Sequence, residues 1–210
     1  MMLRRSFFST FSAMAALAGA GDQPSSAPPS GRFEPARHAP DDWFDQLPGK
    51  HRVVFDTWSA DKFDDAIRFA NNIFRGNKDG YDLSERDHAI VIIVRHRTAP
   101  FAFNDAMWAK YGKPFAERID FTDPKTKQTP AANYYSAQLG ALVKQGVHLG
   151  VCNLTTRSLS QRLAELTGKA QDETYQELTT NTVGNTHFVP AGVLSVTRAQ
   201  EHGYALISIG

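Results

Sequence analysis

The segment HAIVIIVR, residues 88–95, constrains the fold of this 210-residue chain more than any other. It is an almost unbroken run of Ile and Val, without the alternation of polar and apolar residues that marks a strand with one face in water. Such runs are typical of the middle of a parallel sheet whose two faces are both covered by helices. The segment therefore predicts a layered α/β fold around a buried central strand.

Strand-like and helix-like segments alternate on both sides of this run. Ahead of it, the β-branched and aromatic residues 52–57 precede residues 61–75, where apolar side chains recur at helical spacing. After it, the pattern predicts helices at 135–145, 155–166 and 192–202 and strands at 147–151, 187–189 and 204–209. This order predicts an α/β class fold with a doubly wound, mainly parallel sheet of about five strands and helices on both faces.

Residues 97–133 form a connection that is longer than a crossover between two strands requires. They include the large side chains of Met107, Trp108 and Tyr111 and several prolines. Long excursions of this kind usually serve as lids or as oligomer contacts. The alternative is a solvated insertion that has no role.

The N-terminus has the layout of an export signal, with Arg4 and Arg5 followed by a mildly apolar run up to Ala20. The run is too short for a membrane span, so no stable membrane insertion is expected. Paired arginines ahead of phenylalanine resemble the twin-arginine class of signal, which implies export of a folded protein to the periplasm. The alternative is a general secretory signal that happens to carry two arginines. We expect residues 1–20 to be the signal peptide.

Residues 21–50 are rich in proline and serine and show no periodicity, which predicts a linker rather than a packed element. Trp43 and Phe44 are the large side chains near its end, and they could dock that end onto the domain. The folded domain is predicted to span residues 51–210.

Charge and cysteine content exclude several functions. The 23 Lys and Arg residues nearly balance the 22 Asp and Glu residues, so a nucleic-acid partner is not expected. The single cysteine, Cys152, allows neither an intramolecular disulfide nor a zinc site built from several cysteines. No glycine-rich phosphate loop follows the first predicted strand, and no cofactor is expected.

Cys152 directly follows the third predicted strand and precedes a predicted helix. Ligands of open α/β sheets bind beyond the carboxyl ends of the strands, and a helix N-terminus favours the thiolate form of a cysteine. These positions predict a reactive cysteine, with His96, Asn153 and Thr155 as neighbouring binding residues. A buried cysteine that serves as a small apolar residue is the other interpretation, and His96 could equally cap loop carbonyls.

Three segments carry a resemblance to a known family: GVHLGVCNLT at 146–155, FVPAGV at 188–193 and QEHGYA at 200–205. In this order they resemble the DsrE/DsrF-like family, and residues 51–57 and the Asn71-Asn72 segment fit the same pattern. The resemblance implies a small α/β protein that assembles as a homotrimer or hexamer. It also implies that Cys152 is the persulfide carrier in a sulfur relay with a donor or acceptor protein. The export signal and the long excursion depart from the family pattern, which leaves the substrate open.

The sequence leaves a second function open, a non-catalytic module that binds a small ligand or a metal, and it does not decide whether the protein is an enzyme. His96, Cys152 and Met107 together would offer soft ligands suited to copper or haem. His148 lies four residues before Cys152, about 13 Å away on an extended strand at about 3.3 Å per residue. These two side chains are therefore not expected to share a metal.

Overall fold

The computed structural model describes residues 34–210 of the chain. The predicted signal peptide and the first part of the predicted linker lie outside the described residues. Five strands form one sheet: β1 (His51–Thr57), β2 (His88–Val94), β3 (His148–Cys152), β4 (Thr186–Val189) and β5 (Ala205–Ile209). Their order is β4-β3-β2-β1-β5, and every neighbouring pair is parallel. The predicted doubly wound α/β fold is confirmed.

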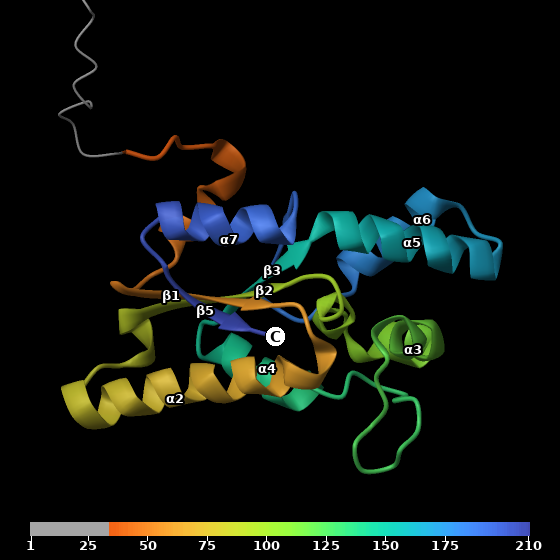
Figure 1. Ribbon diagram of the computed structural model, residues 1–210, viewed down its shortest axis with the longest axis horizontal. Coiled ribbons are helices and arrows are strands. Elements are labelled where there is room, and N and C mark those ends of the chain that lie inside the picture. Colours follow the sequence, from red (N-terminus) through yellow and green to blue (C-terminus); the bar gives the residue numbers. More distant parts are fainter. Residues whose placement is uncertain (1–33) are drawn as a thin grey trace, which may run out of the picture. The chain divides into compact units, whose positions relative to one another are not determined.

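Seven α-helices occur in the described part of the chain. They are α1 (Trp43–Gln46), α2 (Phe63–Tyr81), α3 (Asp105–Ile119), α4 (Ser136–Lys144), α5 (Asn153–Thr167), α6 (Gln171–Thr180) and α7 (Gly192–Glu201). Figure 1 shows α7 on one face of the sheet and α2 and α4 on the other. Short 3-10 helices occur at Ala39–Asp41, Ala60–Lys62, Glu85–Asp87 and Ala99–Ala102. None of the helices described is long and apolar enough to cross a membrane.

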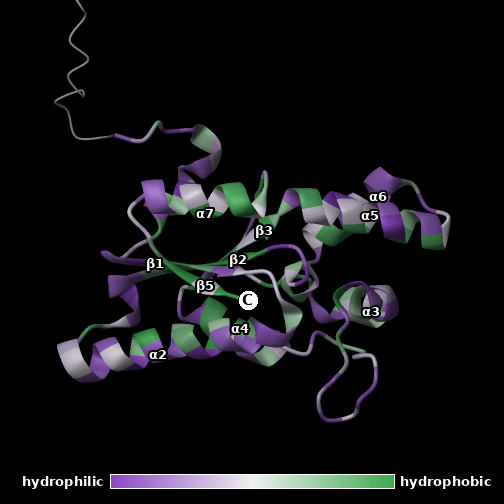
Figure 2. Cartoon of the chain, viewed as in Figure 1, coloured by the Kyte–Doolittle hydropathy of each residue, from purple (hydrophilic) through white to green (hydrophobic). Residues whose placement is uncertain are grey.

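The domain has two hydrophobic cores, one on each face of the sheet, and β2 contributes side chains to both. All seven of its residues are buried, and alternate side chains enter opposite layers. Ile90, Ile92 and Val94 join the larger core with α2, α3 and α4, whereas Val91 and Ile93 join a smaller core with α1 and α7. Figure 2 shows strands coloured largely as apolar, whereas polar and apolar residues alternate along the surrounding helices. The unbroken Ile and Val run is therefore accounted for by burial on both faces.

The excursion at residues 97–133 is largely a packed part of the domain. Its first part forms a 3-10 helix and α3, and both contribute fully buried aromatic side chains to the larger core. Trp108 Nε1 donates a hydrogen bond to the carbonyl of Pro100 over 2.9 Å, and Asn133 Nδ2 donates to the carbonyls of Phe101 and Phe103 over 2.8 Å each. The interpretation of this segment as a solvated insertion is therefore wrong for all but the exposed loop at 122–129.

The end of the predicted linker also belongs to the folded domain. Phe44 in α1 is fully buried, and the hydroxyl of Tyr204 donates a hydrogen bond to its carbonyl over 2.7 Å. Asp45 accepts hydrogen bonds from Arg52 and His202, each 2.8 Å long. Docking of this end through Trp43 and Phe44 is confirmed, and the packed domain begins earlier than the predicted boundary at residue 51. Proline-rich composition hid this segment because its large apolar side chains are few, namely Trp43, Phe44 and Leu47 in and beside one short helix.

Candidate functional site

Cys152 is the last residue of β3 and the residue that caps the N-terminus of α5. The helix begins at Asn153, two residues earlier than the predicted start at Thr155. The cysteine is free and only 6% exposed, and its thiol accepts no capping hydrogen bond from the helix. Thr156 Oγ1 instead donates to the Cys152 carbonyl over 3.0 Å. The first N–H groups of α5 are thus left without a side-chain partner beside the cysteine.

Arg95 follows β2, the strand next to β3, and forms a two-pronged ion pair with Asp56 at the end of β1. Its Nε and Nη2 donate to the two carboxylate oxygens over 2.6 and 2.9 Å. These bonds raise the pKa of Arg95 against the opposing effect of burial, and an electrostatic interaction with Cys152 adds to the rise. The guanidinium is therefore a fixed positive charge within electrostatic reach of the cysteine.

Two features hold Arg95 in place. Its guanidinium lies over the ring of Trp58, 5.2 Å from the ring centre. Gly192, the first residue of α7, lies so close that a Cβ there would be 2.5 Å from the Cβ of Arg95. Only glycine allows α7 to begin this close to Arg95. The N-terminus of α7 therefore borders the site.

The structure brings the sequence-predicted binding residues to the same edge of the sheet. The His96 backbone N–H donates to Thr155 Oγ1 over 3.4 Å, as expected for residues that follow neighbouring strands. The imidazole of His96 is exposed, on a backbone with a φ of +53°, and forms no hydrogen bond with the residues described. Asn153 Oδ1 accepts a 2.7 Å hydrogen bond from Tyr175. Nothing in these contacts makes His96 a base for the thiol.

Sequence reasoning missed Asp56, Arg95 and Gly192. A usable signal was present, because Asp56 and Arg95 stand at the ends of two strands that were both predicted. Oppositely charged residues at the carboxyl ends of adjacent parallel strands meet at one edge of the sheet.

A second cluster joins the two strands at the β4 edge of the sheet. His148 Nδ1 and His187 Nε2 are 2.9 Å apart, so one imidazole donates a hydrogen bond to the other. Trp43 stacks on His187 with ring centres 4.0 Å apart. Burial lowers the pKa of His148, and burial together with the charge of His148 lowers the pKa of His187 to about 4. Both rings are therefore neutral at neutral pH.

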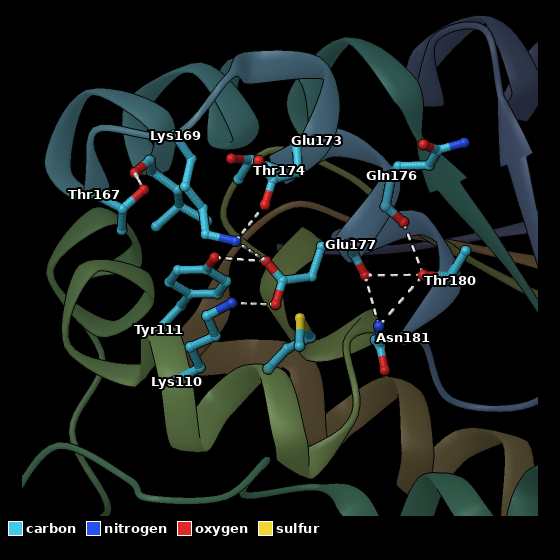
Figure 3. Close-up of polar contacts among 12 residues, drawn as sticks. Lys110, Tyr111, Thr167, Lys169, Glu173, Thr174, Gln176, Glu177, Thr180 and Asn181 are labelled. Atoms are coloured by element: carbon cyan, nitrogen blue, oxygen red, sulfur yellow. Dashed lines mark hydrogen bonds and ion pairs between the residues drawn. The ribbon is translucent and has the colours of Figure 1, made fainter.

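A third cluster is centred on Glu177 of α6, a helix that the sequence analysis did not predict. Figure 3 shows Lys110, Tyr111 and Lys169 gathered around its carboxylate. The hydroxyl of Tyr111 donates to Glu177 over 2.7 Å. Burial would raise the pKa of Glu177, but hydrogen bonds from Lys110 and Tyr111 outweigh it and lower that pKa. The cluster ties α6 to α3 and is accounted for as a structural contact.

Cys152 lines neither of two clefts in the described part of the chain. One of about 310 Å³ is lined by His96 together with Arg97, Glu117, Arg118 and Asp120, at the same edge as the cysteine. A larger one, of about 750 Å³, is formed by the second half of α2, the loop before β2 and Gln145. This larger cleft lies at the amino ends of the strands, whereas Cys152 lies at the carboxyl end of β3.

The described residues contain no group of three or more His, Cys, Asp and Glu side chains placed to hold a metal. Met107, which the sequence offered as a soft ligand with His96 and Cys152, is 4% exposed and lies in the larger core, whereas His96 is exposed.

Comparisons with known proteins identify no family for this chain. No protein-family model and no curated protein matches it. Among solved structures, it is similar to a protein of unknown function, MTH1491, from Methanobacterium thermoautotrophicum, at 18% sequence identity and a TM-score of 0.43. The match covers 76% of this chain and 99% of the other.

Proposed function

We propose that this protein is an exported DsrE-like sulfur carrier that holds a sulfur atom as a persulfide on Cys152. The observation that carries the proposal is the position of the single cysteine. It lies at the carboxyl end of β3, at the uncapped N-terminus of α5 and within electrostatic reach of the Arg95 guanidinium. Both the helix and the arginine favour a negatively charged sulfur at this point.

The proposed reaction is an exchange between sulfur atoms and requires no external oxidant. The thiolate of Cys152 attacks the outer sulfur of a donor persulfide, and the sulfur–sulfur bond of the donor breaks. The outer sulfur is then bonded to Cys152, and the donor leaves as a thiolate. Transfer to an acceptor thiolate repeats the exchange in the opposite direction. Arg95 stabilises the negative sulfur in both states, because its charge is held in place by Asp56.

Cys152 is only 6% exposed, so a reactant reaches its sulfur only through the rim of the site. Three exposed apolar side chains lie in the first turns of α5 and α7: Leu154 at 64% exposure, Val193 at 62% and Leu194 at 41%. Leu154 is two residues beyond the cysteine, and Val193 follows the glycine that contacts Arg95. Exposed apolar residues at a reactive rim favour contact with another protein chain.

The proposal includes self-assembly as a homotrimer or hexamer, and a separate sulfur donor or acceptor protein. The strands β4 and β5 end the sheet, and four of the five β5 residues are not buried. Open sheet edges favour association with a further chain. Light scattering of the mature protein at micromolar concentration tests this part, and a monomer would contradict it.

The reactivity of the thiol is tested by iodoacetamide labelling near neutral pH, where an ordinary thiol is mostly protonated. We expect native mature protein to label faster than the same protein in denaturant, and an Arg95→Gln variant to label more slowly than wild type. A matched Arg68→Gln change, in an exposed ion pair on α2, should leave the rate unchanged. If native protein labels more slowly than denatured protein, Cys152 is a structural residue. The protein would then be a non-catalytic binding module on this fold.

A further inference from the structure

The pairing of β3 with β4 fixes the positions of His148 and His187 relative to each other. In the pairing of β3 with β4, Gly150 is opposite His187, and His148 lies two residues before Gly150 on the same face. The two side chains are therefore diagonal neighbours on adjacent strands, a relationship fixed by the backbone ladder. Trp43 fixes the plane of His187 further, since the two rings are stacked with an angle of 10° between them.

The distance between the two ring nitrogens matches the bite of a chelating pair. His148 Nδ1 and His187 Nε2 are 2.9 Å apart. Metal–imidazole bonds of about 2.0 to 2.1 Å on both nitrogens would give an angle at the metal of about 90°. This is the angle between neighbouring ligands in square-planar and tetragonal complexes, the geometries of Cu(II) and Ni(II). A tetrahedral ion such as Zn(II) prefers a wider angle.

The surroundings leave such an ion accessible. Both histidines are partly buried rather than enclosed, and Trp43 covers one of them from the side of α1. No third His, Cys, Asp or Glu joins them among the residues described, so water would fill the remaining positions. Cys152 stands at the opposite end of β3 and takes no part.

We propose that His148 and His187 form a chelating site for a divalent ion with square-planar preference, of the Cu(II) or Ni(II) class. The ion lies to one side of the line that joins the two nitrogens, and the imidazole that now donates the hydrogen bond moves its proton to its other ring nitrogen. This site is separate from the sulfur chemistry proposed for Cys152, and neither proposal depends on the other.

The test is a titration of the mature protein with Cu(II) alone, followed by tryptophan fluorescence. It uses a Cys152→Ser background, because Cu(II) oxidises free thiols. Cu(II) bound beside Trp43 should quench part of the fluorescence and saturate at one ion per chain. His148→Asn and His187→Asn should each weaken binding about tenfold or more, since each removes one of two ligands. His51→Asn, a change of an exposed histidine at the start of β1, should bind as the background does.

Two further measurements keep the test decisive. Trp43→Phe should retain Cu(II) in equilibrium dialysis while losing the quenching. If a histidine variant fails to fold, electron paramagnetic resonance of the Cu(II)-loaded parent should show coupling to two imidazole nitrogens. A spectrum without such coupling would overturn the proposal. Binding that is unchanged in both His148→Asn and His187→Asn would also overturn it.

Discussion

The guanidinium of Arg95 is held by Asp56 through two hydrogen bonds of 2.6 and 2.9 Å, at the edge of the sheet where Cys152 ends β3. The side chains of Arg95 and Asp56 are only 24% and 10% exposed. Because Asp56 and Arg95 stand at the ends of β1 and β2, the sheet fixes the position of the positive charge beside the cysteine. A substitution that breaks the ion pair should therefore lower both the stability of the protein and the reactivity of Cys152.

Replacing Asp56 with Asn should destabilise the protein, because it leaves the charge of Arg95 largely buried without its partner. We expect a loss of about 2 kcal/mol in the free energy of unfolding, in the range for hydrogen bonds to charged groups. Urea denaturation measures this directly. Asp65→Asn breaks the exposed Arg68–Asp65 pair and should cost less than about 1 kcal/mol. Equal losses in the two variants would show that the Arg95–Asp56 pair stabilises the protein no more than an exposed ion pair does.

Replacing Gly192 with Ala should displace Arg95 or the start of α7. The added Cβ would lie 2.5 Å from the Cβ of Arg95, and overpacking of this kind costs about 1 to 3 kcal/mol. Gly140 is the matched control, because it lies within α4 and nothing is within 4 Å of the position of its Cβ. Gly140→Ala should leave the protein unchanged or stabilise it by up to about 1 kcal/mol. A Gly192→Ala variant that is as stable as wild type would contradict the close approach of α7.

Stability should fall in mild acid because of His187. Its pKa in the folded protein is about 4, against 6.5 for an ordinary histidine, so the unfolded chain binds more protons between these values. The contribution is fully present above about pH 6.5 and is lost as the pH falls toward 4, by roughly 2 to 3 kcal/mol. Urea unfolding near pH 7 and near pH 5 measures it. His187→Gln should show a smaller loss between the two pH values, and an unchanged loss would assign the acid sensitivity to other groups.

Export should depend on Arg4 and Arg5, which lie outside the described residues. The paired arginines resemble the signal read by the twin-arginine route, so replacing both with Lys should hold the precursor inside the cell. A general secretory signal requires only positive charge and would tolerate the exchange. Fractionation of cells that express the two forms distinguishes the routes, and normal export of the Lys-Lys form would contradict the assignment.

The sequence predicted those parts of the fold that have strong periodicity. All five strands were placed within one residue at each end, because runs of β-branched and other apolar residues mark them and glycines end several of the helices between them. The helix α6 was missed because QDETYQELTT buries only Thr174 and Leu178 and therefore lacks an apolar stripe. The helix α3 was missed because its buried residues include Gly112 and its sequence contains Pro114, which is typical of a loop.

The candidate site was predictable only in its position along the chain. The place of Cys152 between a strand and a helix follows from local pattern. The partnership of Arg95 with Asp56, and that of His148 with His187, follows from strand order and register. Neither is encoded in local periodicity, and a shift of one residue in register would turn His187 to the other face of the sheet.

The most direct test of the account is the intact mass of the mature protein after exposure to a small-molecule persulfide donor. Wild type should gain about 32 Da, the mass of one sulfur atom, and should lose it on treatment with a thiol reductant. Cys152→Ser should gain nothing, and Arg95→Gln should gain the sulfur more slowly. Wild-type protein whose mass stays unchanged under conditions that label a denatured control would contradict the assignment of Cys152 as a sulfur carrier.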